Sequence, residues 1–262
     1  MLTEATIRLI RHRRDALSRA VALRSLGLLA VAAPLGVVAS LGAADAGTAA
    51  QTSFCVLTPA ETEGPYFIDH QLERSDVRTD PVDTSPRPGV ALKLTMAIRR
   101  LANAGCLPVA GACVDLWHAD AFGRYSGIAG AADHSRYLRG YQRTDEAGEV
   151  VFTTIVPGWY PGRTVHIHFK VRPDAADSRR YEFTSQLYFD DALLDTIYRS
   201  APYAARGPRN VRNEADGIFT EPVAHDEARG NGTELLLALQ PADGGYAARF
   251  DVALDLPASQ HE

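Results

Sequence analysis

One strictly alternating run, Thr164–Val171, most constrains how this chain can fold. Apolar residues occupy its odd-numbered positions and polar residues its even-numbered ones. Successive side chains of a β-strand point to opposite faces, so this pattern predicts a strand with one face in a core. His166 and His168 then project together from the other face.

Further short runs of β-forming residues are separated by Gly, Pro, Asn and Asp. They lie at 90–98, 112–117, 149–155, 183–189, 234–239 and 246–254. Short strands with turn signals between them are typical of a sandwich or barrel. Asp190–Ser200 has apolar residues at helical spacing, and the chain from about Gly47 to Asp80 is turn-rich. We therefore expect an all-β fold: a single β-sandwich domain with an irregular N-terminal segment and one short helix.

The start of the chain differs from the rest. Six arginines precede an uncharged run, Ser25–Ala44, and the small-x-small site Ala44–Ala46 follows it. This order of charged, apolar and small residues is typical of an export signal. Arg13–Leu17 also resembles a twin-arginine signal. The alternative is a membrane anchor, because an uncharged run of 20 residues is long enough to span a bilayer.

We accordingly expect residues 1–46 to be a signal peptide or anchor, and residues 47–262 to form one domain outside the cytoplasm. The exported domain would be secreted, periplasmic or held at the cell surface. Overall composition is ordinary, with 46% hydrophobic and 23% charged residues, which argues against disorder and against a multi-span membrane protein. The net charge of -5 gives no reason to expect nucleic acid as a partner.

Three cysteines, Cys55, Cys106 and Cys113, all follow the expected signal. In an oxidising compartment two of them are expected to form a disulfide. Cys106 and Cys113 could close a short loop, and Cys55 could pair with either of them, so the residues alone leave the pairing open. No Cys-x-x-Cys motif occurs, which argues against a zinc ribbon.

Two imidazoles on one strand face are a common way to bind a metal, although cupin-like oxygenases and zinc hydrolases use them too. The plainer interpretation is a pair of surface or core histidines. A site with two histidines and one carboxylate would need a nearby acid. None lies within eight residues before His166 or five after His168, and Asp174 is the first beyond them. The motifs of serine hydrolases and nucleotide-binding loops do not occur.

Two turn-rich stretches supply other candidate residues. Pro157–Arg163 contains two prolines and two glycines directly before the alternating run, so its turn would hold Tyr160 and Arg163 near the strand start. Tyr125 ends a second such stretch, Leu116–Tyr125. Without further information, either tyrosine could simply pack, and the arginine could simply be solvated.

Four segments together resemble the intradiol ring-cleavage dioxygenases, the family that includes protocatechuate 3,4-dioxygenase and catechol 1,2-dioxygenase. They are Thr62–Tyr66, Asp115–Asp120, Gly123–Tyr125 and Pro157–Phe169. The resemblance runs from about residue 55 to about residue 256. It is greatest with the smaller, exported bacterial members of the family.

The resemblance implies a non-haem Fe(III) cofactor and a specific set of site residues. Its metal ligands would be Tyr125, Tyr160, His166 and His168. Phenolates are hard anionic donors, which favour the ferric state. Tyr160 would also act as a base, Arg163 would stabilise charge that develops on the ring, and Gln186 would be the active-site glutamine. A solvated strand residue is the plainer interpretation of Gln186.

The implied activity is cleavage of catecholic rings with O2, to give cis,cis-muconate-type diacids. The alternatives are a secreted β-sandwich binding module without turnover and a cupin-like Fe(II) or zinc enzyme. Only five residues separate Tyr160 from His166, and Gly162 stands where the protocatechuate enzymes have a large aromatic residue. These departures imply an open pocket and leave the catechol unidentified. The long helical N-terminal dimerisation region is absent, so the oligomeric state stays open. Exported relatives imply a Cys55–Cys106 disulfide, with Cys113 free.

Overall fold

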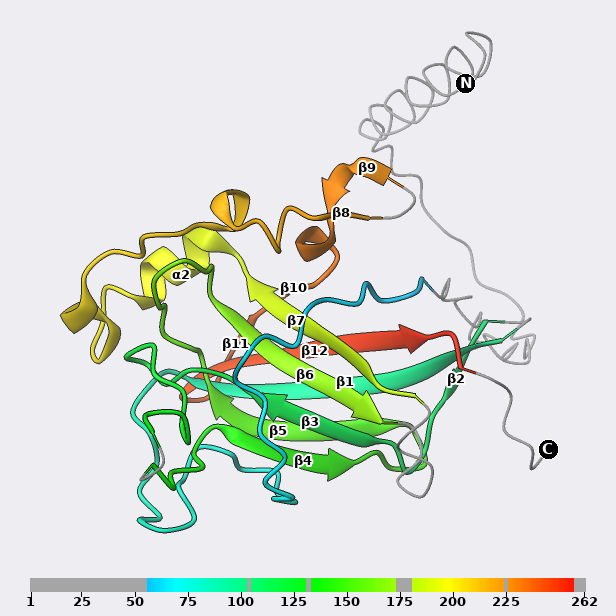
Figure 1. The fold of residues 1–262 in the computed structure, drawn as a ribbon, viewed down its shortest axis with the longest axis horizontal. Coiled ribbons are helices and arrows are strands. Elements are labelled where there is room, and N and C mark those ends of the chain that lie inside the picture. Colours follow the sequence, from blue (N-terminus) through cyan, green and yellow to red (C-terminus); the bar gives the residue numbers. More distant parts are fainter. Residues whose placement is uncertain (1–55, 103–104, 131–132, 173–180, 224–225, 257–262) are drawn as a thin grey trace, which may run out of the picture. The chain divides into compact units, whose positions relative to one another are not determined.

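Two mixed β-sheets form a sandwich, with the hydrophobic core between them (Figure 1). The computed structural model describes residues 56–102, 105–130, 133–172, 181–223 and 226–256. The predicted single β-sandwich is thereby confirmed. The proposed signal or anchor, residues 1–46, lies outside the described residues.

The first sheet contains the alternating run. Its strands, in spatial order, are β10 (Leu236–Leu237), β7 (Phe183–Phe189), β6 (His166–Arg172), β3 (Cys113–Trp117) and β4 (Arg139–Arg143). All neighbouring pairs are antiparallel except β10 with β7, which is parallel. The strand with the two histidines therefore lies in the middle of the sheet, flanked by β7 and β3.

The second sheet closes the sandwich. Its path is β11 (Gln240–Ala242), β12 (Gly245–Leu254), β1 (Ala91–Ala102) and β2 (Gly105–Pro108), and β5 (Glu149–Ile155) also pairs with β1. β1 runs parallel to β12 and antiparallel to β5. A small separate ladder joins β8 (Pro222–Val223) to β9 (Asp226–Gly230).

Helical structure is short throughout the described residues. The α-helix α2 (Asp191–Ile197) begins after Asp190, whose side chain accepts a hydrogen bond from the Leu193 amide as an N-cap. Three 3-10 turns follow, η1 (Tyr203–Arg206), η2 (Asn213–Ala215) and η3 (Asn231–Thr233). The predicted short helix is confirmed. No helix within the described ranges has the length and apolar character needed to cross a bilayer.

Most strand predictions are confirmed, and two differences are informative. β5 and β7 have the predicted bounds. The predicted run 234–239 was wrong in extent, because only Leu236 and Leu237 pair with the edge of β7. β4 was missed, because its sequence Arg-Gly-Tyr-Gln-Arg has no apolar alternation. Pairing with β3, rather than burial of an apolar stripe, holds it in the sheet.

The inward and outward faces of β6 follow the alternation. Val165, Ile167 and Phe169 are buried in the core between the sheets. His166 and His168 point to the opposite, outer face, as their even spacing predicted. The first sheet thus has a polar outer face that is nevertheless buried, since both histidines are almost fully inaccessible to solvent.

The cysteines are partly described. Cys106 is disulfide-bonded, and Cys113 carries a free, buried thiol. Cys55, the predicted partner of Cys106, lies outside the described residues, so that pairing stays a prediction.

The core makes a direct prediction about stability. Phe152 on β5 is fully buried opposite Leu94 of β1. Phe152→Ala should lower the free energy of unfolding by about 3–5 kcal/mol, because it removes apolar contacts and leaves a cavity. Urea unfolding followed by circular dichroism measures this. Val82→Ala, at a position that is 74% exposed, is the control and should change little. Equal unfolding midpoints for the two variants would contradict this description of the core.

Candidate metal centre

Strand register assembles a row of side chains on the outer face of the first sheet. His168 lies opposite Gln186 of β7 and opposite Trp117 of β3, while His166 lies opposite Tyr188. Directly opposed residues in a sheet share a face. These five side chains, which come from three strands, therefore stand together, and all five are buried.

The N-terminal part of the described chain covers this face (Figure 1). The Ser185 hydroxyl donates to the Pro59 carbonyl, and the Gln186 side-chain amide donates to the Thr62 carbonyl. The Arg139 guanidinium, from β4, donates to the carbonyls of Tyr66 and Ser126. The covering segment thus satisfies polar groups on the sheet while excluding water from them.

Two turns carry the tyrosines to the histidines. The turn before Tyr125 is held by Asp120, whose carboxylate accepts the amides of Phe122 and Arg124. The turn before Tyr160 docks on it, because the Gly158 amide donates to the Asp120 carbonyl. These contacts fix both tyrosines, although they are 35 positions apart in the sequence.

The four predicted ligands converge on one point. His166 Nε2 lies 3.1 Å from Tyr160 Oη, 3.1 Å from His168 Nε2 and 3.4 Å from Tyr125 Oη. Around an ion bound tetrahedrally at about 2.0–2.1 Å, neighbouring donor atoms lie about 3.3 Å apart. The spacing of these atoms therefore fits a shared cation.

The hydrogen bonding of His166 leaves its other nitrogen free for a metal. Nδ1 lies 2.7 Å from the Thr164 carbonyl oxygen, which can only accept. Nδ1 therefore carries the ring proton, and Nε2 presents a lone pair to the other three donors. This arrangement, with the far ring nitrogen tied to an acceptor, is typical of metal-ligating histidines.

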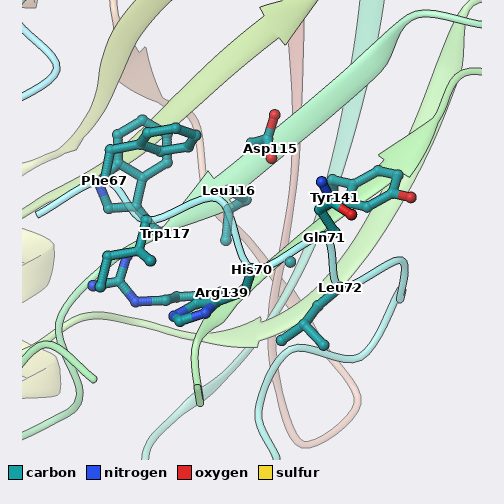
Figure 2. Close-up of a pocket in the computed structure, with 11 residues that line it drawn as sticks. Phe67, His70, Gln71, Leu72, Asp115, Leu116, Trp117, Arg139 and Tyr141 are labelled. Carbon is teal, nitrogen blue, oxygen red and sulfur yellow. The ribbon is translucent and has the colours of Figure 1, made fainter. Parts of the chain in front are cut away.

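His168 is oriented in a different way. Its ring stacks on Trp117, with ring centroids 5.0 Å apart and planes 3° from parallel. Phe67 packs on the indole in turn (Figure 2). Nδ1 of His168 is buried without a hydrogen-bond partner among the described residues. Stacking, rather than a hydrogen bond, sets the plane of this imidazole.

The protonation states of the four donors depend on burial. Burial, followed by the charge of Arg163, lowers the pKa of His166 to about 3. Burial also lowers the pKa of His168 well below its ordinary value and raises the pKa of both Tyr125 and Tyr160. A cation at their centre would reverse the direction for the tyrosines, because it stabilises phenolate. Two neutral imidazoles and two ionisable phenols are a donor set suited to a hard trivalent ion.

Among the described residues, no carboxylate completes this centre. No three side chains of the His, Cys, Asp and Glu types form a metal-binding group in the described part of the chain. The donors that join the two histidines are tyrosine oxygens. This observation disfavours the cupin-like alternative, which needs a carboxylate or a third histidine.

Arg163 and Gln186 form one hydrogen-bonded unit beside the four donors. The Arg163 guanidinium donates to Asp216 Oδ2 at 2.8 Å and to Gln186 Oε1 at 2.7 Å. Gln186 is fully buried, so its interpretation as a solvated strand residue was wrong. Asp216 also accepts the Thr164 amide. Its burial raises the carboxyl pKa, but these hydrogen bonds outweigh burial and hold the pKa below its usual value.

Sequence reasoning missed several residues of this centre. Asp216 lies in an irregular segment 53 positions after Arg163, without a motif to single it out. Trp117 and Tyr66 lie inside two of the segments that resemble the family, but no sequence pattern indicates that they lie beside the metal ligands. Tyr66 packs 4.5 Å from the Tyr125 ring, centroid to centroid.

A pocket opens onto the tyrosine side of the centre. It has a volume of about 650 Å³, and its walls include Tyr66, Tyr125, Tyr137 and Tyr160. Arg124, Ile128 and Asp133 also line it. The pocket thus brings solvent to the side chains of Tyr125 and Tyr160, while both histidines are buried.

Close contact between the two turns is testable. Gly123 has φ +74°, and a Cβ there would lie 2.1 Å from the Trp159 carbonyl oxygen. Gly123→Ala should therefore separate the turns that hold Tyr125 and Tyr160, and cost about 1–3 kcal/mol of stability. Gly130→Ala is a matched control, since Gly130 also has positive φ, but a Cβ there would meet no atom of the described residues within 4 Å. Thermal unfolding compares them, and equal losses would contradict the packing argument.

Comparisons with known proteins agree on one family. Residues 62–215 match the family described as Dioxygenase. Among curated relatives, the protocatechuate 3,4-dioxygenase beta chain of Burkholderia cepacia is 34% identical over 56% of this chain and 63% of its own. The chlorocatechol 1,2-dioxygenase of Pseudomonas sp. (strain P51) is 30% identical over 49% of this chain and 54% of its own. The chain therefore spans less than two thirds of these relatives.

Solved structures match over a larger share. The intradiol ring-cleavage dioxygenase from Tetranychus urticae has a TM-score of 0.66 and 31% identity, covering 79% of this chain and 98% of its own. The dioxygenase domain of a dioxygenase carbohydrate-binding protein fusion from Streptomyces sp. SirexAA-E has a TM-score of 0.54 and 32% identity, covering 77% and 100%. With the family match over more than half of its length, this chain belongs to the intradiol ring-cleavage dioxygenase family.

Proposed function

We propose that this protein is an exported Fe(III)-dependent intradiol dioxygenase, which cleaves catecholic rings with O2 to cis,cis-muconate-type diacids. The observation that carries the proposal is the convergence of His168, Tyr125 and Tyr160 on His166 Nε2, at distances of 3.1–3.4 Å from that atom. Membership of a family that typically uses non-haem Fe(III) supports the identity of the metal.

In this proposal the four side chains would hold the ferric ion, which would supply Lewis acidity toward the catechol and O2. Tyr125 and Tyr160 both line the open pocket, but Tyr125, like His168, is buried, whereas Tyr160 is only partly buried. Tyr160 is therefore the ligand that an incoming substrate meets. We propose that its Oη accepts a proton from a catechol hydroxyl, as the family resemblance implies.

Arg163 provides fixed positive charge beside the metal centre. Asp216 and Gln186 hold its guanidinium from two directions, so little reorganisation is needed when charge develops on a bound ring. Gln186 acts here by orienting Arg163. Its own amide is anchored to the Thr62 carbonyl, at 2.9 Å, which prevents the side chain from turning away.

The pocket supports a substrate larger than catechol itself. A volume of about 650 Å³ exceeds what one dihydroxylated ring requires, and the walls carry several tyrosine rings. Such walls suit ring substituents that pack on aromatic faces. The proposed substrates are accordingly catecholic compounds as a class, including plant phenolics, with O2 as the second substrate.

Export is proposed from the sequence of residues 1–46. Their arginines, uncharged run and small-residue site support a twin-arginine-like signal, with retention as a membrane anchor as the alternative. Export of a folded domain would suit a protein that acquires its metal before it leaves the cytoplasm.

The first test of the proposed activity is colour and oxygen uptake. Iron-loaded protein should be red-brown from phenolate-to-iron charge transfer and should consume O2 with a panel of catechols. Tyr160→Phe should shift the charge-transfer band and lower kcat by about 10²–10⁴-fold, as loss of a catalytic base does. Tyr246→Phe, on β12, is the control and should change neither the charge-transfer band nor kcat.

Other outcomes separate the alternatives. If the iron-loaded protein is colourless, and its absorption spectrum is the same in wild type and Tyr160→Phe, the tyrosine-ligated centre is ruled out. Coloured protein that binds catechols without consuming O2 would favour the binding module. An aldehyde proton in the NMR spectrum of the product would indicate extradiol cleavage, because the intradiol product is a diacid.

The export proposal has its own test. Arg13→Lys with Arg14→Lys should leave the protein in the cytoplasm, because a twin-arginine route depends on both guanidinium groups. Cell fractionation measures this, with Arg8→Lys plus Arg11→Lys as the matched control. N-terminal sequencing of exported protein should begin near Gly47 if the signal is cleaved, and near Met1 if it is kept as an anchor. Unchanged export of the first variant would contradict the twin-arginine proposal.

A further inference from the structure

Glu61 carries a buried carboxyl group that has no role in the proposed chemistry. Tyr188 links this carboxyl group to Gln186 and Arg163. Glu61 is only 9% exposed. Its Oε2 accepts a hydrogen bond from the Tyr188 hydroxyl at 2.5 Å, whereas Oε1 is buried with no partner among the described residues. Burying a carboxylate with one unpaired oxygen costs free energy. Packing alone therefore does not explain why a carboxyl group is buried at this position.

Tyr188 connects this carboxyl to the metal centre. Its hydroxyl oxygen lies 3.4 Å from Gln186 Oε1, the same atom that accepts the Arg163 guanidinium at 2.7 Å. Its ring also faces His166 from the neighbouring strand, with centroids 6.3 Å apart. A continuous chain of polar contacts therefore runs from Glu61 through Tyr188 and Gln186 to Arg163.

The charges that face Glu61 come from several segments of the chain. Arg163 attracts negative charge on Glu61, while Asp216 and Glu221 repel it, and Tyr188 donates to it. Burial exceeds all of these effects and raises the pKa of Glu61 to about 7. Burial also raises the pKa of Tyr188, so the phenol keeps its proton throughout. Glu61 is thus the member of this group that changes its charge near neutral pH.

Resting on the proposed function, we propose that Glu61 and Tyr188 are positioning residues. One proton on Glu61 decides whether the Tyr188 hydroxyl donates to Glu61 or to Gln186, and so how firmly Gln186 holds Arg163.

The two states follow from counting donors. When Glu61 is ionised, the Tyr188 proton goes to Glu61 Oε2, and Gln186 Oε1 accepts from Arg163. When Glu61 takes a proton from solvent, its new O–H donates to the Tyr188 oxygen. The Tyr188 O–H then turns to Gln186 Oε1, which it shares with Arg163. The ionised state therefore favours a firmly held guanidinium.

The test is the pH profile of kcat/KM for the iron-loaded enzyme between pH 5.5 and 8.5. The wild type should rise through about pH 7 by roughly two- to tenfold, the range expected for one hydrogen bond. Glu61→Gln and Tyr188→Phe should each abolish this rise in kcat/KM. The glutamine side chain cannot ionise, and the phenylalanine ring has no hydroxyl group to donate to Glu61 or Gln186. Glu182→Gln, an exposed carboxyl just before β7, is the matched control and should keep the rise. A rise that survives in Glu61→Gln would overturn the inference.

A second measurement separates this inference from the proposed function. A carboxyl whose pKa is raised in the fold makes the protein lose stability as pH rises from about 4.5 to about 7. Glu61→Gln removes this loss, so its Tm relative to wild type should be more favourable at pH 8 than at pH 5.5. A Tm difference that does not change with pH would contradict the inference alone. Absence of turnover with every catechol would contradict the proposed function alone.

Discussion

The register of β6 against β3 and β7 is the constraint on which the metal centre depends. Burial of Ile167 and Phe169 fixes which face of β6 is inward, and a slip of one residue would exchange the two faces. The correct register places Trp117 beside His168 and Tyr188 beside His166. Hydrophobic packing on one side of the sheet thus determines the chemistry on the other.

The outer face of this sheet is polar yet dry, because the N-terminal segment and two turns cover it. Burial keeps the imidazoles neutral and strengthens every electrostatic interaction around them. Burial also explains why the surrounding polar groups are hydrogen-bonded. Arg163 donates to Asp216 and Gln186, and Arg139 donates to the Tyr66 carbonyl. Nδ1 of His168 and Oε1 of Glu61 are exceptions, because both are buried without a hydrogen-bond partner among the described residues.

Prediction from sequence succeeded where burial of neighbouring side chains imposes a short repeating pattern on the sequence. The period-two alternation identified β6 and the common face of its histidines, since burial imposes that period directly. Arg139–Arg143 and Asp216 escaped notice because neither has such a pattern. β4 is held by pairing with β3, and Asp216 by hydrogen bonds to residues about 50 positions away. Interactions of that range leave no periodic signal along the chain.

By itself the sequence determined the β-sandwich class, the shared face of His166 and His168, and the family resemblance that indicated Tyr125 and Tyr160. Those features depend on side-chain periodicity and on residue types within short segments. Only the tertiary structure decided that the four donors meet at one point and that Gln186 is buried against Arg163. Distances between segments arise when two sheets, two turns and a covering segment pack together, and that packing is a property of the whole chain.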